Sequence, residues 1–157
     1  MQYDVKSAYA SASGSLVTTR NRLKSFTFTT TSAASGTLAF FETTTKTGTS
    51  ARVSTTATIT CTAHGLTTGD YVYLDFAATG PADGRYQVTV TDADTFTVTV
   101  TAAGADVAVT VYTIERIAVG TYSADTSMVL IPGEGVLFEE GIFVSLPANT
   151  NTTIFYG

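Results

Sequence analysis

Residues 53–111 alternate regularly between apolar and polar positions. Between residues 53 and 61, one parity holds Val53, Ala57, Ile59 and Cys61, and threonines dominate the other. A period of two residues is typical of a β-strand that buries one face. The same alternation returns in four more segments, residues 71–76, 85–90, 95–100 and 107–111. Turns rich in Gly, Pro and Asp separate the segments, which predicts about five short strands in a small barrel or sandwich.

The segments on either side of this region have a different pattern of apolar and polar residues. Residues 20–31 and 37–42 are predicted as strands, residues 43–52 as a polar connector, and residues 1–19 as an extended arm with room for one short strand. From Ile114 onward, solid apolar runs such as MVLI, GVLF and GIFVSL replace the alternation. Apolar runs bounded by turn residues favour strands that are buried on both faces.

The fold class predicted from these patterns is all-β. Thr is the commonest residue, and Val, Phe and Tyr are frequent; such side chains suit a pleated, half-buried surface. The change of texture predicts a discontinuous base domain of residues 1–51 plus 115–157, a small β-sandwich of jelly-roll or immunoglobulin-like type. Residues 52–114 would be an inserted β-barrel or sandwich module, since insertions succeed at exposed loop tips. One continuous sandwich is the alternative.

A stretch with Pro132, Gly133 and Gly135 around Glu134 is the most specialised-looking turn of the chain. It lacks the Gly-x-x-x-x-Gly-Lys pattern with which a phosphate loop reaches its ligand. Proline presets φ and glycine permits positive φ, which is turn chemistry. We therefore predict a turn between two strands here.

Charge and cysteine content exclude several classes of protein. Charged residues make up 13% of the chain, against about 25% in typical domains, and the formal net charge is −5. Eight scattered Lys and Arg residues cannot form the basic stripe of a nucleic-acid binder. The single cysteine can form neither an internal disulfide nor a zinc cluster. We also expect no membrane span and no signal peptide, because no apolar run is long enough.

The scarcity of charge bears on assembly as well. Soluble monomers usually carry about 25–35% charged residues on their surfaces. The shortfall favours a surface that other subunits cover, and thus a homo-oligomer. A neutral surface rich in Ser and Thr that is soluble alone is the other interpretation.

The residues that could carry catalysis are few. His64 is the one histidine, and Cys61 lies three residues before it but on the apolar parity, so a Cys–His pair is disfavoured and a turn histidine is favoured. Asp92 and Asp94 flank Ala93, where turn aspartates commonly bond their own backbone rather than Ca²⁺.

A carboxylate pair for glycoside hydrolysis would have to come from Asp70, Asp75 and Asp83. No spacing in the sequence places two of them across a cleft, about 5–9 Å apart, as that chemistry requires. We therefore predict no catalytic residues, no cofactor and no metal site, and a protein that is not an enzyme.

Four segments of the flanks carry a resemblance: YDVKSAYASASG, TRNRLKSF, LIPGEGVLF and VSLPANTNTTIFYG. They resemble short β-rich virion structural proteins of tailed marine bacteriophages, including cyanophages. The middle region, with TITCTAHGLTTGDYVYLDF, resembles small β modules found in phage tail and fibre proteins. The resemblance implies a virion structural protein that is assembled in the host cytoplasm.

Two segments are candidates for docking onto phage capsid or tail proteins. The first is a basic cluster on one strand face: Arg20, Arg22 and Lys24. It could dock on an acidic patch of a neighbour, or be the solvated side of an edge strand that charge protects from stray pairing. The second is the apolar end of the chain: Ile154, Phe155 and Tyr156. This end should be tied down, as a sheet strand or as an anchor in a partner.

The function expected from these features is that of a capsid decoration or cement subunit, which binds the shell without catalysis. The alternative is a tail, fibre or adaptor component. In that case the inserted module would touch host glycans through three aromatic side chains: Tyr71, Tyr73 and Tyr86. A glycan hydrolase is a third possibility, which the scarcity of His, Cys and clustered acids disfavours.

Overall fold

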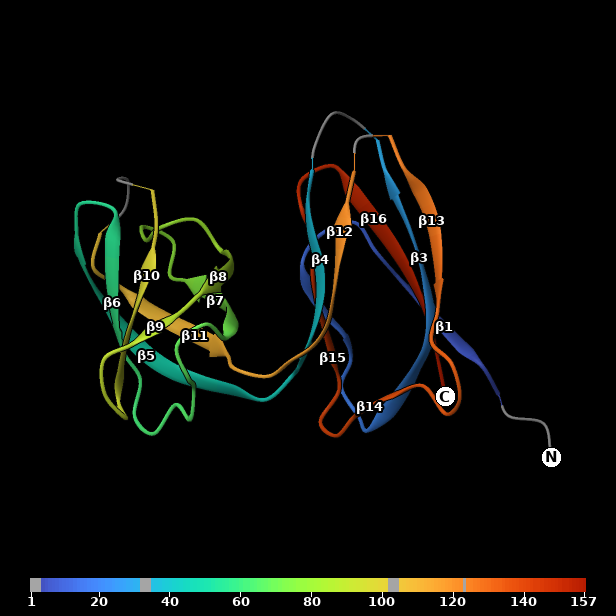
Figure 1. The fold of residues 1–157 in the computed structure, drawn as a ribbon, viewed down its shortest axis with the longest axis horizontal. Coiled ribbons are helices and arrows are strands. Elements are labelled where there is room, and N and C mark those ends of the chain that lie inside the picture. Colours follow the sequence, from blue (N-terminus) through green and yellow to red (C-terminus); the bar gives the residue numbers. More distant parts are fainter. Residues whose placement is uncertain (1–3, 32–34, 102–104, 123) are drawn as a thin grey trace. The chain divides into compact units, whose positions relative to one another are not determined.

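The computed structural model describes residues 4–31, 35–101, 105–122 and 124–157, and within them every regular element is a strand, β1 to β16 (Figure 1). The all-β prediction is therefore confirmed. The chain divides into two compact units, unit 1 with Met1–Thr43 and Arg116–Gly157, and unit 2 with Thr44–Glu115. Unit 2 thus lies in sequence between the two halves of unit 1.

The first junction differs from the one predicted at residues 51/52. The expected polar connector is strand β5 (Thr45–Val53), which pairs with β6 (Thr56–Thr60) and β11 (Ala108–Tyr112) inside unit 2. The positions of β5 that lie across from buried Val109 and Val111 are Gly48 and Lys46. Because these residues are not apolar, the strand carries no hydrophobic alternation for a sequence pattern to detect.

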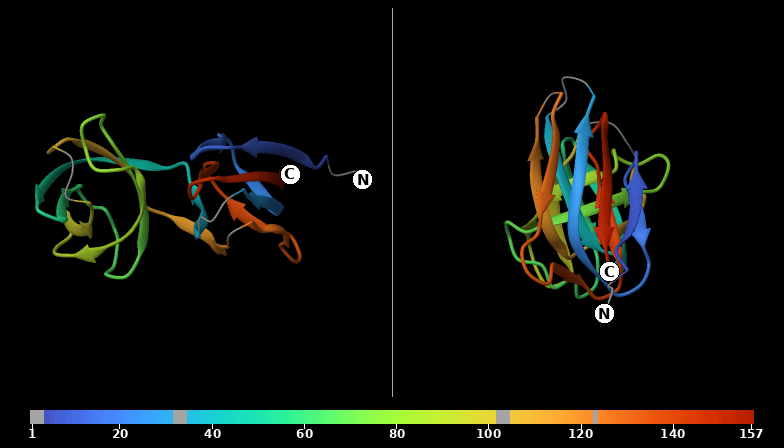
Figure 2. Two further views of the ribbon diagram at one scale, coloured as in Figure 1. Left: turned by 90° about the horizontal axis from the view of Figure 1, so that it is seen from above. Right: turned by 90° about the vertical axis from the view of Figure 1, so that its right-hand side faces the viewer.

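Unit 1 is a sandwich of two antiparallel sheets (Figures 1 and 2). Sheet A has the order β1 (Lys6–Ala10), β16 (Thr150–Tyr156), β3 (Asn21–Thr30) and β13 (Thr126–Leu130), and β14 (Val136–Phe138) continues beside β3. Sheet B has the order β12 (Glu115–Thr121), β4 (Gly36–Glu42), β15 (Ile142–Ser145) and β2 (Gly14–Val17). The residues expected to form an extended arm therefore supply two strands, β1 and β2, rather than one.

The core of unit 1 fills the space between sheets A and B. Phe26 of sheet A meets Phe40 of sheet B edge to face, with ring centroids 4.8 Å apart. Ile154 lies opposite Phe26 on β16 and is fully buried. Burial of such side chains contributes about 1.5–3 kcal/mol each.

The apolar runs of the C-terminal half differ in how they are buried. All residues of β15 are buried, as expected for a strand covered on both faces. In contrast, β12 and β13 alternate between exposed and mostly half-buried side chains. The expectation of double burial is wrong for these two strands, because one of their faces points away from the core. Strand β16, which lies inside sheet A, alternates for the same reason.

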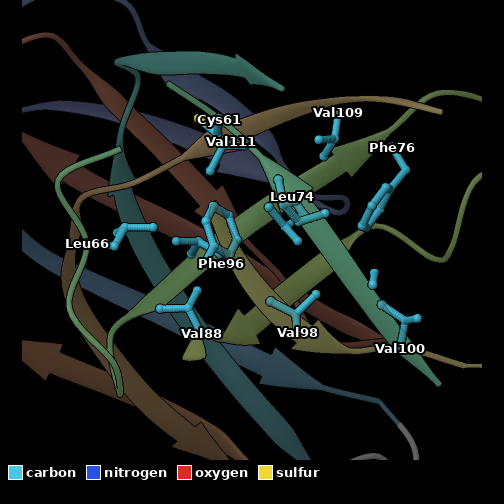
Figure 3. Close-up of a cluster of buried hydrophobic side chains, with 13 residues drawn as sticks. Cys61, Leu66, Leu74, Phe76, Val88, Phe96, Val98, Val100, Val109 and Val111 are labelled. Carbon is cyan, nitrogen blue, oxygen red and sulfur yellow. The ribbon is translucent and has the colours of Figure 1, made fainter. Parts of the chain in front are cut away.

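Unit 2 is one curled sheet with the order β8 (Gly84–Gln87), β7 (Tyr71–Phe76), β11, β5, β6, β10 (Thr95–Thr99) and β9 (Thr89–Val90). The first and last strands of this order, β8 and β9, are separated in sequence by Val88 alone. The sheet is therefore close to a closed barrel. Its interior is packed with the predicted apolar face, including Leu74, Phe96 and Val111 (Figure 3).

One member of that predicted face lies elsewhere. Val53 is 80% exposed, because residues 53–61 are not one strand. The chain turns at Ser54, whose φ is 57°, and Val53 pairs with Thr56 across this hairpin. The burial of Ala57, Ile59 and Cys61 follows the prediction.

Candidate functional site

The turn after β13 is held by two members of the basic cluster, Arg22 and Lys24 of β3. Gly133 and Gly135 have φ of 70° and 79°, and a Cβ on Gly135 would lie 2.4 Å from the Leu23 carbonyl oxygen, so glycine is required there. Lys24 Nζ donates to the Glu134 carbonyl oxygen at 2.9 Å, and Arg22 Nη1 donates to the Gly135 carbonyl oxygen at 3.4 Å. The predicted turn between two strands is confirmed.

Arg20, the third member of the basic cluster, forms an ion pair with Glu139. Its Nε lies 2.6 Å from Glu139 Oε2, in a pair whose side chains are 65% and 51% exposed. An ion pair at such exposure stabilises by about 0–1 kcal/mol. All three cations meet acceptors of their own unit, which disfavours a docking site for an acidic partner. The prediction of an edge strand is wrong, because β3 pairs with β16 on one side and with β13 and β14 on the other.

The C-terminal strand is tied into the sheet. β16 pairs with β1 on one side and β3 on the other. Ile154 belongs to the core and is not accessible to a partner, whereas Phe155 and Tyr156 are half-buried. Of the three apolar residues proposed for docking, Phe155 is on the face of sheet A that points away from the core.

That face, which we call the outer face of sheet A, carries two rows of side chains across the four strands. The strand registers give the first row as Tyr9, Thr153, Thr27 and Met128, and the second as Ser7, Phe155, Ser25 and Leu130. Neither row contains a charged residue. Tyr9, Met128 and Leu130 are 62%, 58% and 70% exposed.

A shallow groove of about 210 Å³ runs over the same face, lined by Tyr9, Thr27, Thr29, Asn151 and Thr153 among others. Sequence inspection did not identify this surface. Its residues come from four strands that are far apart in the chain, and only the register of sheet A brings them together.

In unit 2, the outer side of β7 and β8 carries a packed polar cluster of Tyr71, Arg85 and Glu115. The Arg85 guanidinium carbon lies 3.5 Å from the centre of the Tyr71 ring. Arg85 Nε and Nη2 donate to the two Glu115 carboxylate oxygens at 2.5 and 2.9 Å, and both side chains are less than one-fifth exposed. This bidentate, stacked arrangement is among the stronger ion-pair geometries.

Two open depressions border the cluster. One of about 370 Å³ is lined by Asp70, Tyr71, Ile114 and Glu115, together with Gly69 and Thr113. The other, of about 630 Å³, is lined by residues 85–89, by Thr68 and Gly69 of the loop before β7, and by Thr99. The two depressions share Gly69.

The three tyrosines proposed for glycan contact do not form one surface. Tyr73 is buried, 7% exposed, with its ring 5.8 Å from that of Tyr112. Tyr86 lies opposite Val72, packs on the barrel core beside Phe76 and donates its hydroxyl to the Ala82 carbonyl oxygen. Tyr71 and Tyr86 are both partly exposed, and each lines a different one of the two depressions. Pairing of β8 with β7, which the sequence does not reveal, places Tyr86 on the core side.

His64 has a structural role. Its Nδ1 accepts a hydrogen bond from the Leu66 amide at 3.0 Å, so Nε2 carries the proton and donates to the Asp92 carbonyl oxygen at 3.0 Å. The ring is 4% exposed and meets Phe96 edge to face. Cys61 is buried in the barrel core, and this burial raises the pKa of its thiol, with nearby Lys46 lowering it and Asp94 raising it further.

The aspartates are mostly engaged in turns. Asp92 Oδ1 accepts from the Asp94 amide, and Asp94 Oδ1 accepts from the Ala63 amide. Asp70 accepts from both the amide and the hydroxyl of Thr67. These contacts agree with the interpretation of turn aspartates that bond backbone.

Of the three aspartates considered for glycoside hydrolysis, the other two are Asp75 and Asp83. The Oδ1 of Asp83 accepts from the Phe76 amide at 2.8 Å. Burial, and then the charge of Asp83, raises the pKa of Asp75 above its usual range. In the described parts of the chain, no group of three or more His, Cys, Asp or Glu side chains is placed to hold a metal ion. Within the same residues there is also no helix with the length and apolarity of a membrane span.

Comparison with known proteins adds nothing to this geometry. No family model, no curated protein and no solved structure matches the chain. What the protein does must therefore be inferred from its own surfaces and from the resemblance of its flanks.

Proposed function

We propose that this protein is a non-enzymatic structural protein of a tailed-phage virion, a decoration or cement subunit that binds the capsid shell. The observation that carries the proposal is the outer face of sheet A in unit 1. Its two rows of side chains contain no charged residue, and it exposes Tyr9, Met128 and Leu130 in a chain whose net charge is −5. The resemblance of the flanks to phage virion proteins supplies the kind of partner.

The binding energy available from this face suits subunits that bind the shell several at a time. Full burial of Tyr9, Met128 or Leu130 would contribute at most about 1.5–3 kcal/mol each, and part of this burial already exists in the free protein. Association costs about 4–15 kcal/mol in lost freedom, so one subunit alone would bind a shell weakly. Subunits joined to one another would bind much more tightly through avidity.

Quantitative mass spectrometry of purified virions tests the proposal. A copy number comparable to that of the major capsid protein supports a subunit that covers the shell. Absence from the virion overturns the proposal.

Rebinding to shells that lack the protein tests the docking face. Tyr9→Asp places a charge in the first row of the face and should abolish binding, because the charge would be desolvated on contact. Val53→Asp changes an exposed apolar residue of unit 2 and should bind like the wild type. Equal binding by both variants would exclude the outer face of sheet A as the docking surface.

A tail, fibre or adaptor component that contacts host glycans is the second candidate. The observation that favours it is the partly exposed Tyr71 beside a depression that also contains Asp70 and Glu115. An aromatic ring and carboxylate acceptors are side chains that can contact sugar faces and hydroxyls. A handful of copies per virion, together with glycan-array binding that Tyr71→Ala removes, would establish this candidate in place of the first.

A further inference from the structure

The outer edge of β13 presents unpaired backbone groups. The Ile131 amide donates to the Lys24 carbonyl oxygen at 3.0 Å, and the Thr30 amide donates to the Asp125 carbonyl oxygen at 2.8 Å. In an antiparallel pair the residues that bond the neighbour alternate. The odd-numbered residues of β13 therefore bond β3, and Thr126, Met128 and Leu130 direct their N–H and C=O groups away from it.

The other edge strands of the described sheets are protected from stray pairing. Each of three edge strands carries at least one charged residue: Lys6 in β1, Arg116 in β12 and Arg85 in β8. Strands β2, β9 and β14 have four, two and three residues and are too short to offer a long edge. Charge and shortness are common ways to block an edge.

Strand β13 has neither protection. Its sequence, TSMVL, contains no charge and no proline, and it exposes Met128 and Leu130 by more than half. An exposed apolar edge of this kind invites pairing with another strand. We propose that the β13 edge binds the β13 edge of a second copy of this chain, antiparallel and with the two-fold axis at Met128.

The strand is self-complementary in this register. Alignment of Met128 with Met128 of the second copy sets Thr126 opposite Leu130 of the second copy, and Leu130 opposite its Thr126. All three residues direct their backbone groups to the open edge in both copies, so each outward N–H meets an outward C=O. A two-fold interface of this type is isologous, the commonest arrangement in soluble oligomers.

A second copy fits this edge better than a charged partner does. The paired residues carry no charge, so the net charge of −5 does not oppose contact at the edge itself. Pairing also joins the outer faces of the two sheets A into one surface. The inference does not depend on the capsid proposal, but such a dimer would present the docking face twice.

Sedimentation velocity on charge variants tests the pairing. The wild type should be a dimer. Met128→Lys and Met128→Glu should each raise the dimer dissociation constant at least about tenfold, since like charges directly opposite in a sheet repel. An equimolar mixture of the two variants should recover the dimer, because the lysine of one chain then meets the glutamate of the other.

Tyr9→Asp is the matched control, since it places a charge on the same face of sheet A at its opposite edge. It should leave the dimer intact. A monomeric wild type at high concentration overturns the inference, as does a dimer that survives both Met128 variants. Failure of the mixed variants to recover the dimer overturns the register.

Disulfide trapping gives a second readout. Paired residues in this register have Cα atoms about 5.5 Å apart, within disulfide range. Met128→Cys should cross-link two chains on oxidation, whereas Thr126→Cys should not, because it lies opposite Leu130 of the second copy. The native Cys61 is buried and adds no background. Dimers that form but do not bind shells would leave this inference standing and remove the capsid proposal.

Discussion

Glu42 is buried at the end of β4, and its replacement by alanine should destabilise unit 1 strongly. The side chain is 2% exposed and Oε1 lies 2.8 Å from Arg116 Nη2. Its two oxygens also accept the amides of Glu139 and Glu140, at 3.1 and 3.2 Å. One carboxylate thus holds the turn between β14 and β15.

The cost can be worked out from these contacts. Each backbone amide that loses its acceptor in a buried position costs about 1–3 kcal/mol. Arg116 is 36% exposed, so water can replace its lost partner and it adds little. We expect Glu42→Ala to lower the free energy of unfolding by about 2–4 kcal/mol, a range that overlaps the cost of about 3–5 kcal/mol for breaking a fully buried pair. For a unit of this size that lowers Tm by roughly 8–32 °C.

Differential scanning calorimetry is the assay, because unfolding of two units can give two transitions. The transition of unit 1 should shift and that of unit 2 should not. Glu139→Gln is the control, since it removes only the exposed pair with Arg20 and should cost less than about 1 kcal/mol. Equal shifts for the two variants would refute the role assigned to the Glu42 carboxylate.

Three further predictions concern unit 2. His64→Ala should destabilise it by about 2–4 kcal/mol, measured by chemical denaturation, because the ring fills the core beside Phe96 and satisfies two backbone groups; a loss below about 1 kcal/mol would contradict this. Cys61 should react with a thiol reagent only as fast as unit 2 opens, since the thiol is buried and its pKa is raised; rapid labelling of the native protein would count against the packing. Burial, then Asp83, raises the pKa of Tyr86 above 10.0, so the folded state keeps this proton to higher pH than the unfolded state. The stability of unit 2 should therefore fall as pH rises from about 10 upward, and Tyr86→Phe should make the fall shallower in denaturation curves recorded across that range.

Much of the fold follows from local pattern. The strict alternation at Ala57, Ile59 and Cys61 predicts one buried face because a strand turns its side chains to opposite sides. The glycines around Glu134 predict a turn for an equally local reason, since a positive φ is cheap only without a Cβ. The change in texture at Ile114 places the end of unit 2 close to Glu115, where the structure has it.

Strand β5 shows where the pattern fails. Its core-facing positions include Lys46 and Gly48, so its place in the barrel depends on hydrogen bonds to β6 and β11 and not on its own hydrophobicity. Close packing requires the small residue, since a Cβ on Gly48 would lie 2.6 Å from the Thr60 carbonyl oxygen. A sequence pattern reports side chains, and strand pairing is a property of the backbone.

For the candidate surfaces, too, some features follow from the sequence and others from the tertiary structure alone. By itself, the sequence determined the all-β class, the buried face of unit 2 and the turn at Gly133 and Gly135, because each depends on residue types at short range. The tertiary structure alone decided that Glu42 caps a turn, that Tyr86 faces the core while Tyr71 stacks on Arg85, and that the outer face of sheet A is continuous. Sheet register sets these relations between distant segments, and register depends on the joint packing of all the strands.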